Sequence, residues 1–459
     1  MSERQYLCID QRSFYATVEC VARGLDPLEA DLVVADAERS ENTICLAVSV
    51  HLKSRGVKNR CRLKDIPPHI KCIVAVPRMQ LYIDCAAAIY GVFLKYLAPE
   101  DIYVYSIDES FLDVTPYLKM YGTTAKELAQ RIIQDVRETV GTICTCGIGT
   151  NLYLAKIALD IIAKKAPDSI GILDEQSYRE RLWDHQPITD FWRISHGTEA
   201  RLKRYGISTM RDIALFDEDC LYRCFGVDAE LLIDHAWGWE PCTIADIKSY
   251  RPASNSLSSG QVLTRPYKCK EAKLIVREMT ELLVLDLVEK HLVTDQIVLT
   301  VGYDIENLTD KNISEGYKGD ITVDRYGRKI PKHAHGTAHT SRQTSSTKLI
   351  MDATLKLYDE IVDKKLLVRR VTIAACNLVP ESSIENKQSY EQLDLFKDYD
   401  ELMAKREQEE KALQKERKIQ EAMIDIKERY GKNAILKGTN LQEGATTIER
   451  NESIGGHKA

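Results

Sequence analysis

The sequence predicts a multidomain protein of mixed class, in which an α/β domain is followed by helices and then by a smaller α+β domain. Strand-like and helical patterns alternate over the first 185 residues, which is typical of a sheet covered by helices. Short helical patterns follow, and a second set of strands and helices fills residues 253–380. A chain of 459 residues is long enough for two to four domains.

The first predicted domain spans residues 1–185. The apolar run at 6–10 predicts a strand that ends at an acid, and Ser13 is expected to cap the helix that follows. Further strands are expected at 32–35, 43–48, 102–107, 111–114 and 143–148. Helices are expected at 124–140 and 152–164.

The rest of the chain divides into a helical domain, a linker, an α+β domain and a tail. Residues 186–240 contain two helix–turn–helix patterns with glycine in the turn, and 241–252 is a linker with Pro and Ser. In the α+β domain, strands are expected at 256–263, 296–303 and 370–378, and helices at 270–290 and 349–364. The tail, 381–459, is expected to hold a charged helix over 399–430 and a poorly packed end from 438 onward.

Charge is distributed unevenly along the chain. The net charge of −6 argues weakly against nucleic acid as a partner, but two stretches are basic. Residues 42–64 hold six Lys or Arg and no acid, and residues 325–348 hold six Lys or Arg, three His and no acid. Such stretches suit contact with phosphates. A solvated loop is the alternative for the second one.

Composition also restricts where the protein works. No run of about 18 uninterrupted apolar residues is present, and the N-terminus lacks the apolar region of a secretory signal. The 13 cysteines lack metal-site spacing, so we expect them to be reduced and mostly buried. A cytoplasmic protein without a membrane contact is the expectation.

Three acids suggest a metal site. Asp10 ends the first predicted strand, and Asp108 and Glu109 lie between two later strands. Adjacent residues on a strand face opposite sides, so the chain must bend at 108–109, as at a hairpin tip. Three converging carboxylates need a divalent cation, and a Mg²⁺ pair would support in-line phosphoryl transfer. The alternative is a pair of surface acids at a turn.

Three ordered segments resemble the motifs of Y-family DNA polymerases, most closely the UmuC-type translesion polymerases. They are residues 9–19 (IDQRSFYATVE), residues 106–115 (SIDESFLDVT), and residues 147–151 (GIGTN) followed by 154–158 (LAKIA). The resemblance covers roughly residues 5–380. It implies a right-hand architecture, with palm and fingers in 1–185 (fingers about 27–80), a thumb in 186–240 and a little finger in 253–380.

The resemblance also implies roles for the site. Asp10, Asp108 and Glu109 would bind two Mg²⁺ ions together with the backbone carbonyl of Gln11. Tyr15, beside Phe14, would be the steric gate that excludes a 2′-hydroxyl, although taken alone it is better explained as a core aromatic on an amphipathic helix. Triphosphate contacts would come from Lys53 and from Lys164 or Lys165. Val50 departs from the pattern, because many relatives carry a Tyr there that touches the triphosphate.

Contacts with DNA and with the sliding clamp are expected farther along the chain. The turn at Gly197 resembles a helix-hairpin-helix that grips phosphates with backbone N–H groups. In the little finger, the expected DNA contacts are Arg325, Arg328, Lys329, Lys332 and Arg342. Residues 392–396 (QLDLF) are similar to the motif with which bacterial polymerases bind the clamp, through Gln392, Leu393, Leu395 and Phe396. The alternative is that these side chains dock the tail on the body.

The resulting hypothesis is a template-directed DNA polymerase that extends primers past damaged template, in DNA repair and the SOS response. Its expected partners are primer-template DNA, deoxynucleoside triphosphates, the sliding clamp and accessory subunits. Two alternatives remain open at this point. One is a catalytically weak DNA- and clamp-binding protein that keeps the polymerase fold. The other is a nucleotide cyclase, which would share the palm-like sheet and two metals.

Overall fold

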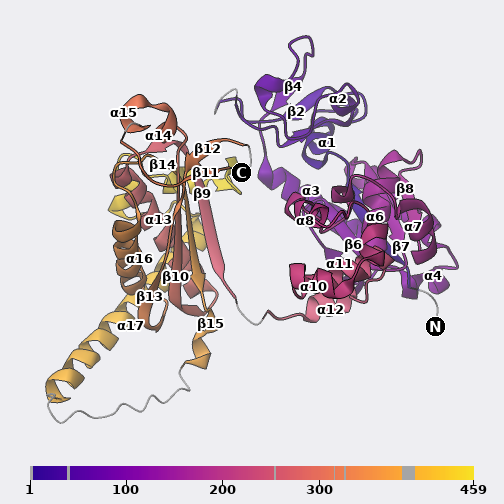
Figure 1. Ribbon diagram of the computed structural model, residues 1–459. Coiled ribbons are helices and arrows are strands. Elements are labelled where there is room, and N and C mark those ends of the chain that lie inside the picture. The colour runs from indigo at the N-terminus through magenta and orange to yellow at the C-terminus, as the bar shows by residue number, and fades with distance from the viewer. Residues whose placement is uncertain are drawn as a thin grey trace. The chain divides into compact units, whose positions relative to one another are not determined.

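The computed structural model describes residues 4–38, 42–252, 255–314, 316–324, 327–384 and 399–458. The chain forms two compact units, one of residues 1–250 with 457–459 and one of residues 251–456. Figure 1 shows a mixed α/β body in the first unit and, in the second, a large antiparallel sheet with helices packed on it. Among the described residues, no helix is both long and apolar enough to span a membrane.

The palm sheet places the first predicted strand at its centre. Its order is β5-β6-β1-β7-β8, and β1 is antiparallel to both of its neighbours. The strands are β1 (Tyr6–Gln11), β5 (Ile102–Val104), β6 (Glu109–Asp113), β7 (Cys144–Gly149) and β8 (Ile170–Leu173). All five were expected except β8, which pairs in parallel with β7.

Helices cover both faces of this sheet, as the alternation of side chains requires. Leu7 and Ile9 face the core beneath α3 (Met79–Phe93) and α5 (Ala125–Val140). On the other face, α6 (Leu152–Ile157) lies so close that a Cβ at Gly147 would come within 2.0 Å of a backbone oxygen of the helix. The predicted helix 152–164 is not uniform, because α6 continues as a π-helical turn (Ala158–Ile162) and then a 3₁₀ turn (Ala163–Lys165).

The fingers form a small separate core within the first unit. Three short strands build it, β2 (Leu32–Val34), β3 (Ala47–Val48) and β4 (Ile73–Ala75), with α2 (Val50–Ser54) packed beside them. The strand expected at 43–48 is therefore shorter than predicted. Only an isolated bridge between Ile44 and Arg62 extends it.

The helix α1 (Phe14–Val21) begins where predicted, but its expected cap is wrong. Ser13 occupies the cap position in left-handed conformation (φ 50°), and its side chain makes no capping hydrogen bond. Its hydroxyl instead accepts a hydrogen bond from Lys53 Nζ at 2.8 Å. This contact ties the start of the helix to the fingers.

Short helices complete the first unit. They are α4 (Thr115–Tyr121), α7 (Glu175–Leu182), α8 (His196–Lys203), α9 (Met210–Leu215), α10 (Glu218–Phe225), α11 (Asp228–Trp237) and α12 (Ile244–Ser249). The helix α12 fills most of the predicted linker 241–252. Ile244 is buried against the α6 face of the palm, so the linker prediction is corrected: the units divide only after residue 250.

The second unit is an antiparallel sheet of order β13-β10-β14-β9 with two helices on one face (Figure 1). The strands are β9 (Leu257–Tyr267), β10 (Leu292–Tyr303), β13 (Ala334–Thr344) and β14 (Val368–Cys376). The helices are α13 (Cys269–Glu289) and α16 (Thr347–Ile361). Smaller elements are α14 (Glu306–Thr309), α15 (Lys311–Ser314), β11 (Ile321–Val323), β12 (Lys329–Pro331) and β15 (Val379–Pro380). Neither β12 nor β13 was predicted, because the basic stretch reads as a loop.

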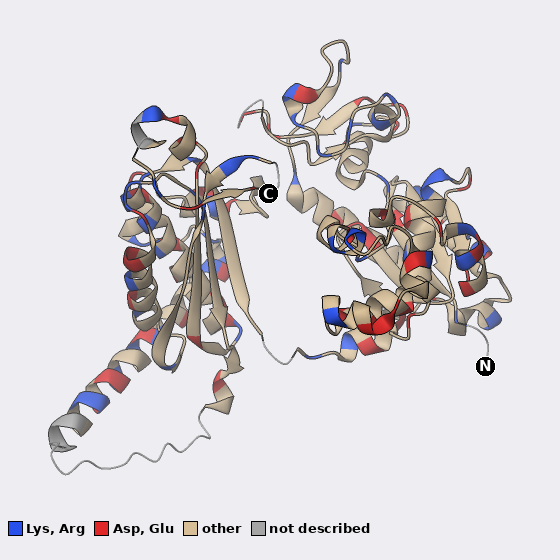
Figure 2. Cartoon of the chain, viewed as in Figure 1, with Lys and Arg blue, Asp and Glu red and all other residues tan. Residues whose placement is uncertain are grey.

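The tail belongs to the second unit. The charged helix α17 (Tyr399–Tyr430) has the predicted bounds, and Figure 2 shows cations and acids interspersed along it. The end expected to be poorly packed instead forms a 3₁₀ turn (Gly438–Leu441) and α18 (Thr447–Asn451). Glu278 of α13 is only 2% exposed and accepts hydrogen bonds from Asn440 Nδ2 at 3.0 Å and Thr446 N at 2.8 Å. Polar contacts of this kind leave no apolar pattern in the sequence.

Candidate active site

The predicted bend before β6 is present. Backbone N–H groups of Tyr105 and Ser106 both donate to the carbonyl of Glu109, each at 3.0 Å, and the Gln11 N–H donates to the carbonyl of Asp108 at 2.9 Å. These bonds hold the tip of the β5–β6 hairpin against the end of β1. Asp10 lies directly opposite Glu109 in the β1–β6 ladder, so both side chains leave the sheet on one face.

A cavity of about 720 Å³ opens at this end of the sheet. Asp10 and Asp108 line one part of it, and the fingers line another. Glu109 is not among the lining residues, because its carboxylate accepts hydrogen bonds from Lys156 Nζ at 2.8 Å and from Cys8 Sγ at 3.1 Å. Two of the three predicted carboxylates, those of Asp10 and Asp108, therefore line the cavity together. The third, that of Glu109, is paired with the buried Lys156 instead.

Lys156 belongs to a chain of alternating charges that sequence reasoning missed. Its ammonium also lies 3.0 Å from Asp160, which in turn lies 2.7 Å from Lys164 Nζ. Lys164 reaches the cavity, and Lys165 is not among its lining residues. The spacing of 156, 160 and 164, one helical turn each, was the available signal.

The environment of Asp10 disfavours its negative charge. Burial raises its pKa to about 7, with smaller contributions from Asp108 and Glu109, while Lys164 opposes them. A carboxyl that is half protonated near neutral pH favours a cation beside it. No three His, Cys, Asp or Glu side chains in the described part of the chain are placed to hold a metal ion as they stand. The hard oxygen donors of Asp10 and Asp108 nevertheless fit a divalent cation of the Mg²⁺ type.

Gln11 can serve the site only through its backbone. It lines the cavity, but its side chain points into the protein, where Oε1 accepts hydrogen bonds from Thr142 Oγ1 at 2.8 Å and Cys144 Sγ at 3.2 Å. Only its backbone is thus left to serve the site, as the resemblance implies. The backbone role itself stays a prediction.

Tyr15 lies in the cavity wall. Its ring stacks on Tyr82, with centroids 4.4 Å apart and an interplanar angle of 18°, and lies 5.7 Å from the ring of Phe14. Phe14 is buried in the palm core, whereas Tyr15 is only partly buried. Burial, and then the nearby Asp108, raise the pKa of Tyr15. The ring of Tyr15 is thus held at the cavity wall by its stacking on Tyr82, which is consistent with the predicted steric gate.

Cations line the cavity from both sides. Lys53 lies in the fingers wall, and burial, aided by Arg12 and Lys164, lowers its pKa. Arg12, Asn59 and Arg60 also line the cavity, and none of them was named from the sequence. Arg60 lies within the basic stretch 42–64, which was the signal for it.

The predicted DNA contacts of the second unit are largely engaged with acids. Arg328 pairs with Asp324 at 2.7 Å, Lys332 with Asp320 at 3.0 Å, and Arg342 lies 3.8 Å from Glu410 of α17. Lys329 begins β12 and is exposed. Arg325 and the clamp motif 392–396 lie outside the described residues.

The uncovered face of the second sheet offers another surface. Ile297, Leu299 and Val301 of β10 pack beneath the helices, so Gln296, Val298 and Thr300 face the other way. In the ladder, Thr300 pairs with His335 and Thr372, and Gln296 pairs with His339. The exposed Arg370 of β14 is on the same face. The alternation of His, Thr and Ser along β13 was the available signal.

The turn predicted at residues 194–197 is only partly present, because Gly197 lies within α8 and only a 3₁₀ turn (Ile188–Asp190) directly precedes that helix. Ser195 caps α8 by accepting a hydrogen bond from Thr198 N at 3.1 Å, and Gly197 follows in the first turn. A Cβ at Gly197 would meet nothing closer than the Ser195 hydroxyl, at 3.6 Å. The turn is thus open to an approaching backbone, and its contact with DNA stays a prediction.

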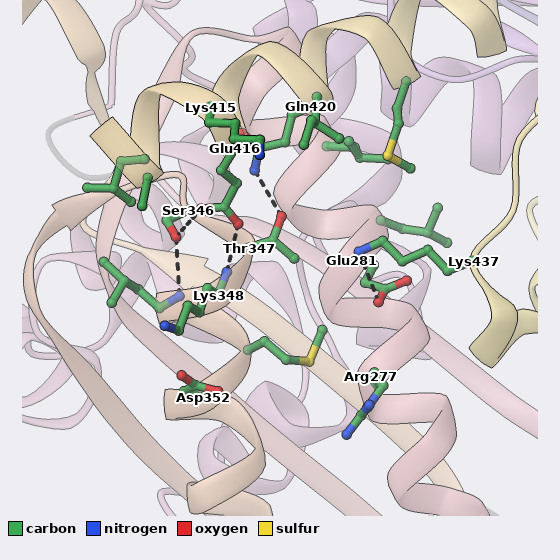
Figure 3. A pocket seen from close by; sticks show the side chains of 18 of the residues that line it. Arg277, Glu281, Ser346, Thr347, Lys348, Asp352, Lys415, Glu416, Gln420 and Lys437 are labelled. Atoms are coloured by element: carbon green, nitrogen blue, oxygen red, sulfur yellow. Dashed lines mark hydrogen bonds and ion pairs between the residues drawn. The ribbon is translucent and has the colours of Figure 1, made fainter. Parts of the chain in front are cut away.

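A larger cavity, of about 1190 Å³, lies in the second unit between α13, α16 and α17 (Figure 3). Glu416 of α17 caps α16 there, accepting from Ser346 Oγ at 2.6 Å and from Lys348 N at 3.0 Å. Lys437 pairs with Glu281 at 3.2 Å. These polar groups hold the tail on the domain, so we read this cavity as a packing seam rather than a reaction site.

Comparisons agree with this geometry. Residues 9–160 match the impB/mucB/samB family, and residues 254–395 match the C-terminal domain of that family. The chain is 29% identical to a Bacillus subtilis (strain 168) protein named for UV-damage repair, UvrX, covering 99% of this chain and 98% of the relative. It is 27% identical to DNA polymerase IV 2 of the same organism, covering 100% and 99%.

A solved structure shows the fold. A chimeric Y-family DNA polymerase matches with a TM-score of 0.59 and 19% identity, covering 82% of this chain and 99% of that chain. The predicted right-hand architecture with a little finger is confirmed by this likeness.

Proposed function

We infer that this chain, which belongs to the impB/mucB/samB family, is a DNA-directed DNA polymerase of the translesion type that acts in DNA damage repair. One observation carries the inference from geometry. A single cavity holds two carboxylates, Asp10 and Asp108, a backed aromatic ring, Tyr15, and the cations Lys53 and Lys164. That set matches the metals, sugar and triphosphate of a bound deoxynucleotide.

Each residue of the cavity would contact a different part of the bound nucleotide or its metal ions. Asp10 and Asp108, with the Gln11 carbonyl, would hold two Mg²⁺ ions, and Glu109 would join them by leaving Lys156. When bound, such a pair activates a primer hydroxyl and neutralises the leaving pyrophosphate. Lys53 and Lys164 would orient the triphosphate in line with the primer. Tyr15 would lie under the sugar and exclude a 2′-hydroxyl.

The partners follow from the same reading. Primer-template DNA would contact the thumb turn at Gly197 and the second unit, and residues 392–396 would bind the bacterial sliding clamp. Accessory subunits and a cytoplasmic location belong to the proposal. Low fidelity is expected from the resemblance to translesion polymerases.

Primer extension with Mg²⁺, on intact and on damaged template, tests the function. Asp108→Asn keeps the shape of the side chain but removes a ligand charge, so extension should fall by roughly 10³-fold or more while DNA binding survives. DNA binding without extension by the unaltered protein would favour the non-catalytic alternative. Formation of a cyclic nucleotide instead of extended primer would favour the cyclase.

A further inference from the structure

The fingers wall of the cavity holds an arginine that the proposed function does not use. Val50, Lys53, Asn59 and Arg60 all line this wall. The side chain of Val50 offers no hydrogen-bond donor, so a nucleotide held from this side needs a donor from another residue of the wall.

Arg60 is placed to supply it. Its backbone adopts the left-handed conformation, φ 57°, which a residue with a Cβ rarely takes. Such backbone strain persists where the surrounding structure requires it. The result is that an arginine at a loop turn lines the cavity beside Lys53.

The guanidinium of Arg60 has no hydrogen-bond or ion-pair partner among the residues that the structure describes. Two other arginines of the fingers differ, since Arg55 pairs with Asp31, and Arg78 pairs with Glu19 at 2.6 Å. An unpaired arginine facing a cavity is free to bind an anion.

The charge in the cavity indicates what that anion is. Four cations line it, Arg12, Lys53, Arg60 and Lys164, against the two carboxylates at the palm end. One of the four, Lys164, already pairs with Asp160. Once Asp10 and Asp108 hold a divalent cation, the other three cations are available together to one polyanion.

We propose that Arg60 binds the triphosphate of the incoming nucleotide. A guanidinium suits this role because its planar fork binds phosphate oxygens in pairs. The proposal rests on the proposed polymerase function and adds a specific binding residue to it.

Steady-state primer extension with each of the four deoxynucleotides tests the proposal. Arg60→Gln should raise KM about tenfold for all four nucleotides and leave kcat within about twofold, because the lost contact is equally present in ground and transition states. Arg60→Lys should raise KM less, since it keeps the charge but not the fork. Arg55→Gln is the matched control, an arginine of the fingers that pairs with Asp31 outside the cavity, and should leave KM unchanged.

A second variant separates binding from folding. Arg60→Gly removes the cation but relieves the left-handed backbone, so it should show the same rise in KM without a lower Tm. Affinity for dTTP, measured on enzyme bound to a dideoxy-terminated primer, should fall in parallel without any turnover. A KM within twofold of the unaltered protein, or a rise confined to some bases, would overturn the triphosphate contact. Absence of extension by the unaltered protein would instead count against the polymerase function.

Discussion

At the scale of single residues, Asp10 is placed for binding a cation at the expense of stability. Its ordinary pKa is 3.8, and burial with two neighbouring carboxylates raises the pKa to about 7 in the folded protein. The folded state therefore binds the proton more tightly than the unfolded state does. As pH rises from about 4 to 7, this group makes folding progressively less favourable, and above pH 7 the full cost remains.

Asp10→Asn should accordingly stabilise the metal-free protein more at pH 8 than at pH 5, where only about a third of the cost is present. A shift of about three pKa units corresponds to at most roughly 4 kcal/mol, so we expect a rise in Tm of several degrees at pH 8. The measurement is thermal unfolding in a chelator at both values of pH. Added Mg²⁺ should reverse the order at pH 8, because only the carboxylate binds it. An equal effect at pH 5 and pH 8 would contradict this account of Asp10.

Tyr15 gives a second prediction at this scale. Tyr15→Ala should raise the incorporation of ribonucleotides relative to deoxynucleotides by roughly 10-fold or more, because the loss of a rigid ring removes on the order of 1.4 kcal/mol or more of discrimination. Tyr15→Phe is the control, since it keeps the ring stacked on Tyr82 and should keep the selectivity. Competition between the two nucleotide types on one template measures the ratio. Unchanged selectivity in Tyr15→Ala would make the ring a core aromatic only.

At the scale of helices and strands, apolar periodicity predicted the elements that bury apolar faces. The strands β1, β6 and β7 and the helices α5, α13, α16 and α17 were all predicted within a few residues. The hairpin that carries Asp108 and Glu109 followed from the requirement that adjacent carboxylates reach one site. The site residues came mainly from motif resemblance. The cavity adds Arg12, Asn59 and Arg60 to them, and the ion pair with Glu109 adds Lys156.

The failures at this scale share a physical cause: they involve polar or small side chains, whose contacts leave no apolar periodicity in the sequence. Ser13 was expected to cap its own helix but bonds to Lys53, 40 residues away. The strand β13 was missed because its outward residues are His, Thr and Ser and its inward ones are small. Acids at 320 and 324 neutralise basic residues that had been counted alone.

The packing of the tail is tested through the buried carboxylate of Glu278. Asn440→Ala removes one of its donors while leaving it covered, and should lower the free energy of unfolding by about 1–3 kcal/mol. In a Glu278→Leu background, the same change should cost much less, because no carboxylate then needs the donor. Chemical denaturation of the four chains gives the coupling. Equal effects of Asn440→Ala in both backgrounds would mean that the two side chains do not interact in solution.

At the scale of the whole molecule, the net charge of −6 means that affinity for DNA depends on local surfaces. Two surfaces of the second unit are candidates for binding DNA. The β12 region holds Arg328 and Lys332, each paired with an acid. The uncovered sheet face holds Arg370 among Thr, Ser and His side chains.

Arg370→Gln should therefore weaken the binding of duplex primer-template DNA more than Arg328→Gln does. An arginine that contacts a phosphate releases counterions on binding, so its loss should make the slope of log affinity against log salt shallower by about 0.9. Arg328 gains less from a phosphate, because it must first leave Asp324 at 2.7 Å. Both variants should act alike on all sequences, since the contact is with the backbone. A salt titration of binding on one duplex measures both slopes. A larger change in the salt slope for Arg328→Gln than for Arg370→Gln would indicate that DNA binds at the β12 region, as the sequence alone suggested.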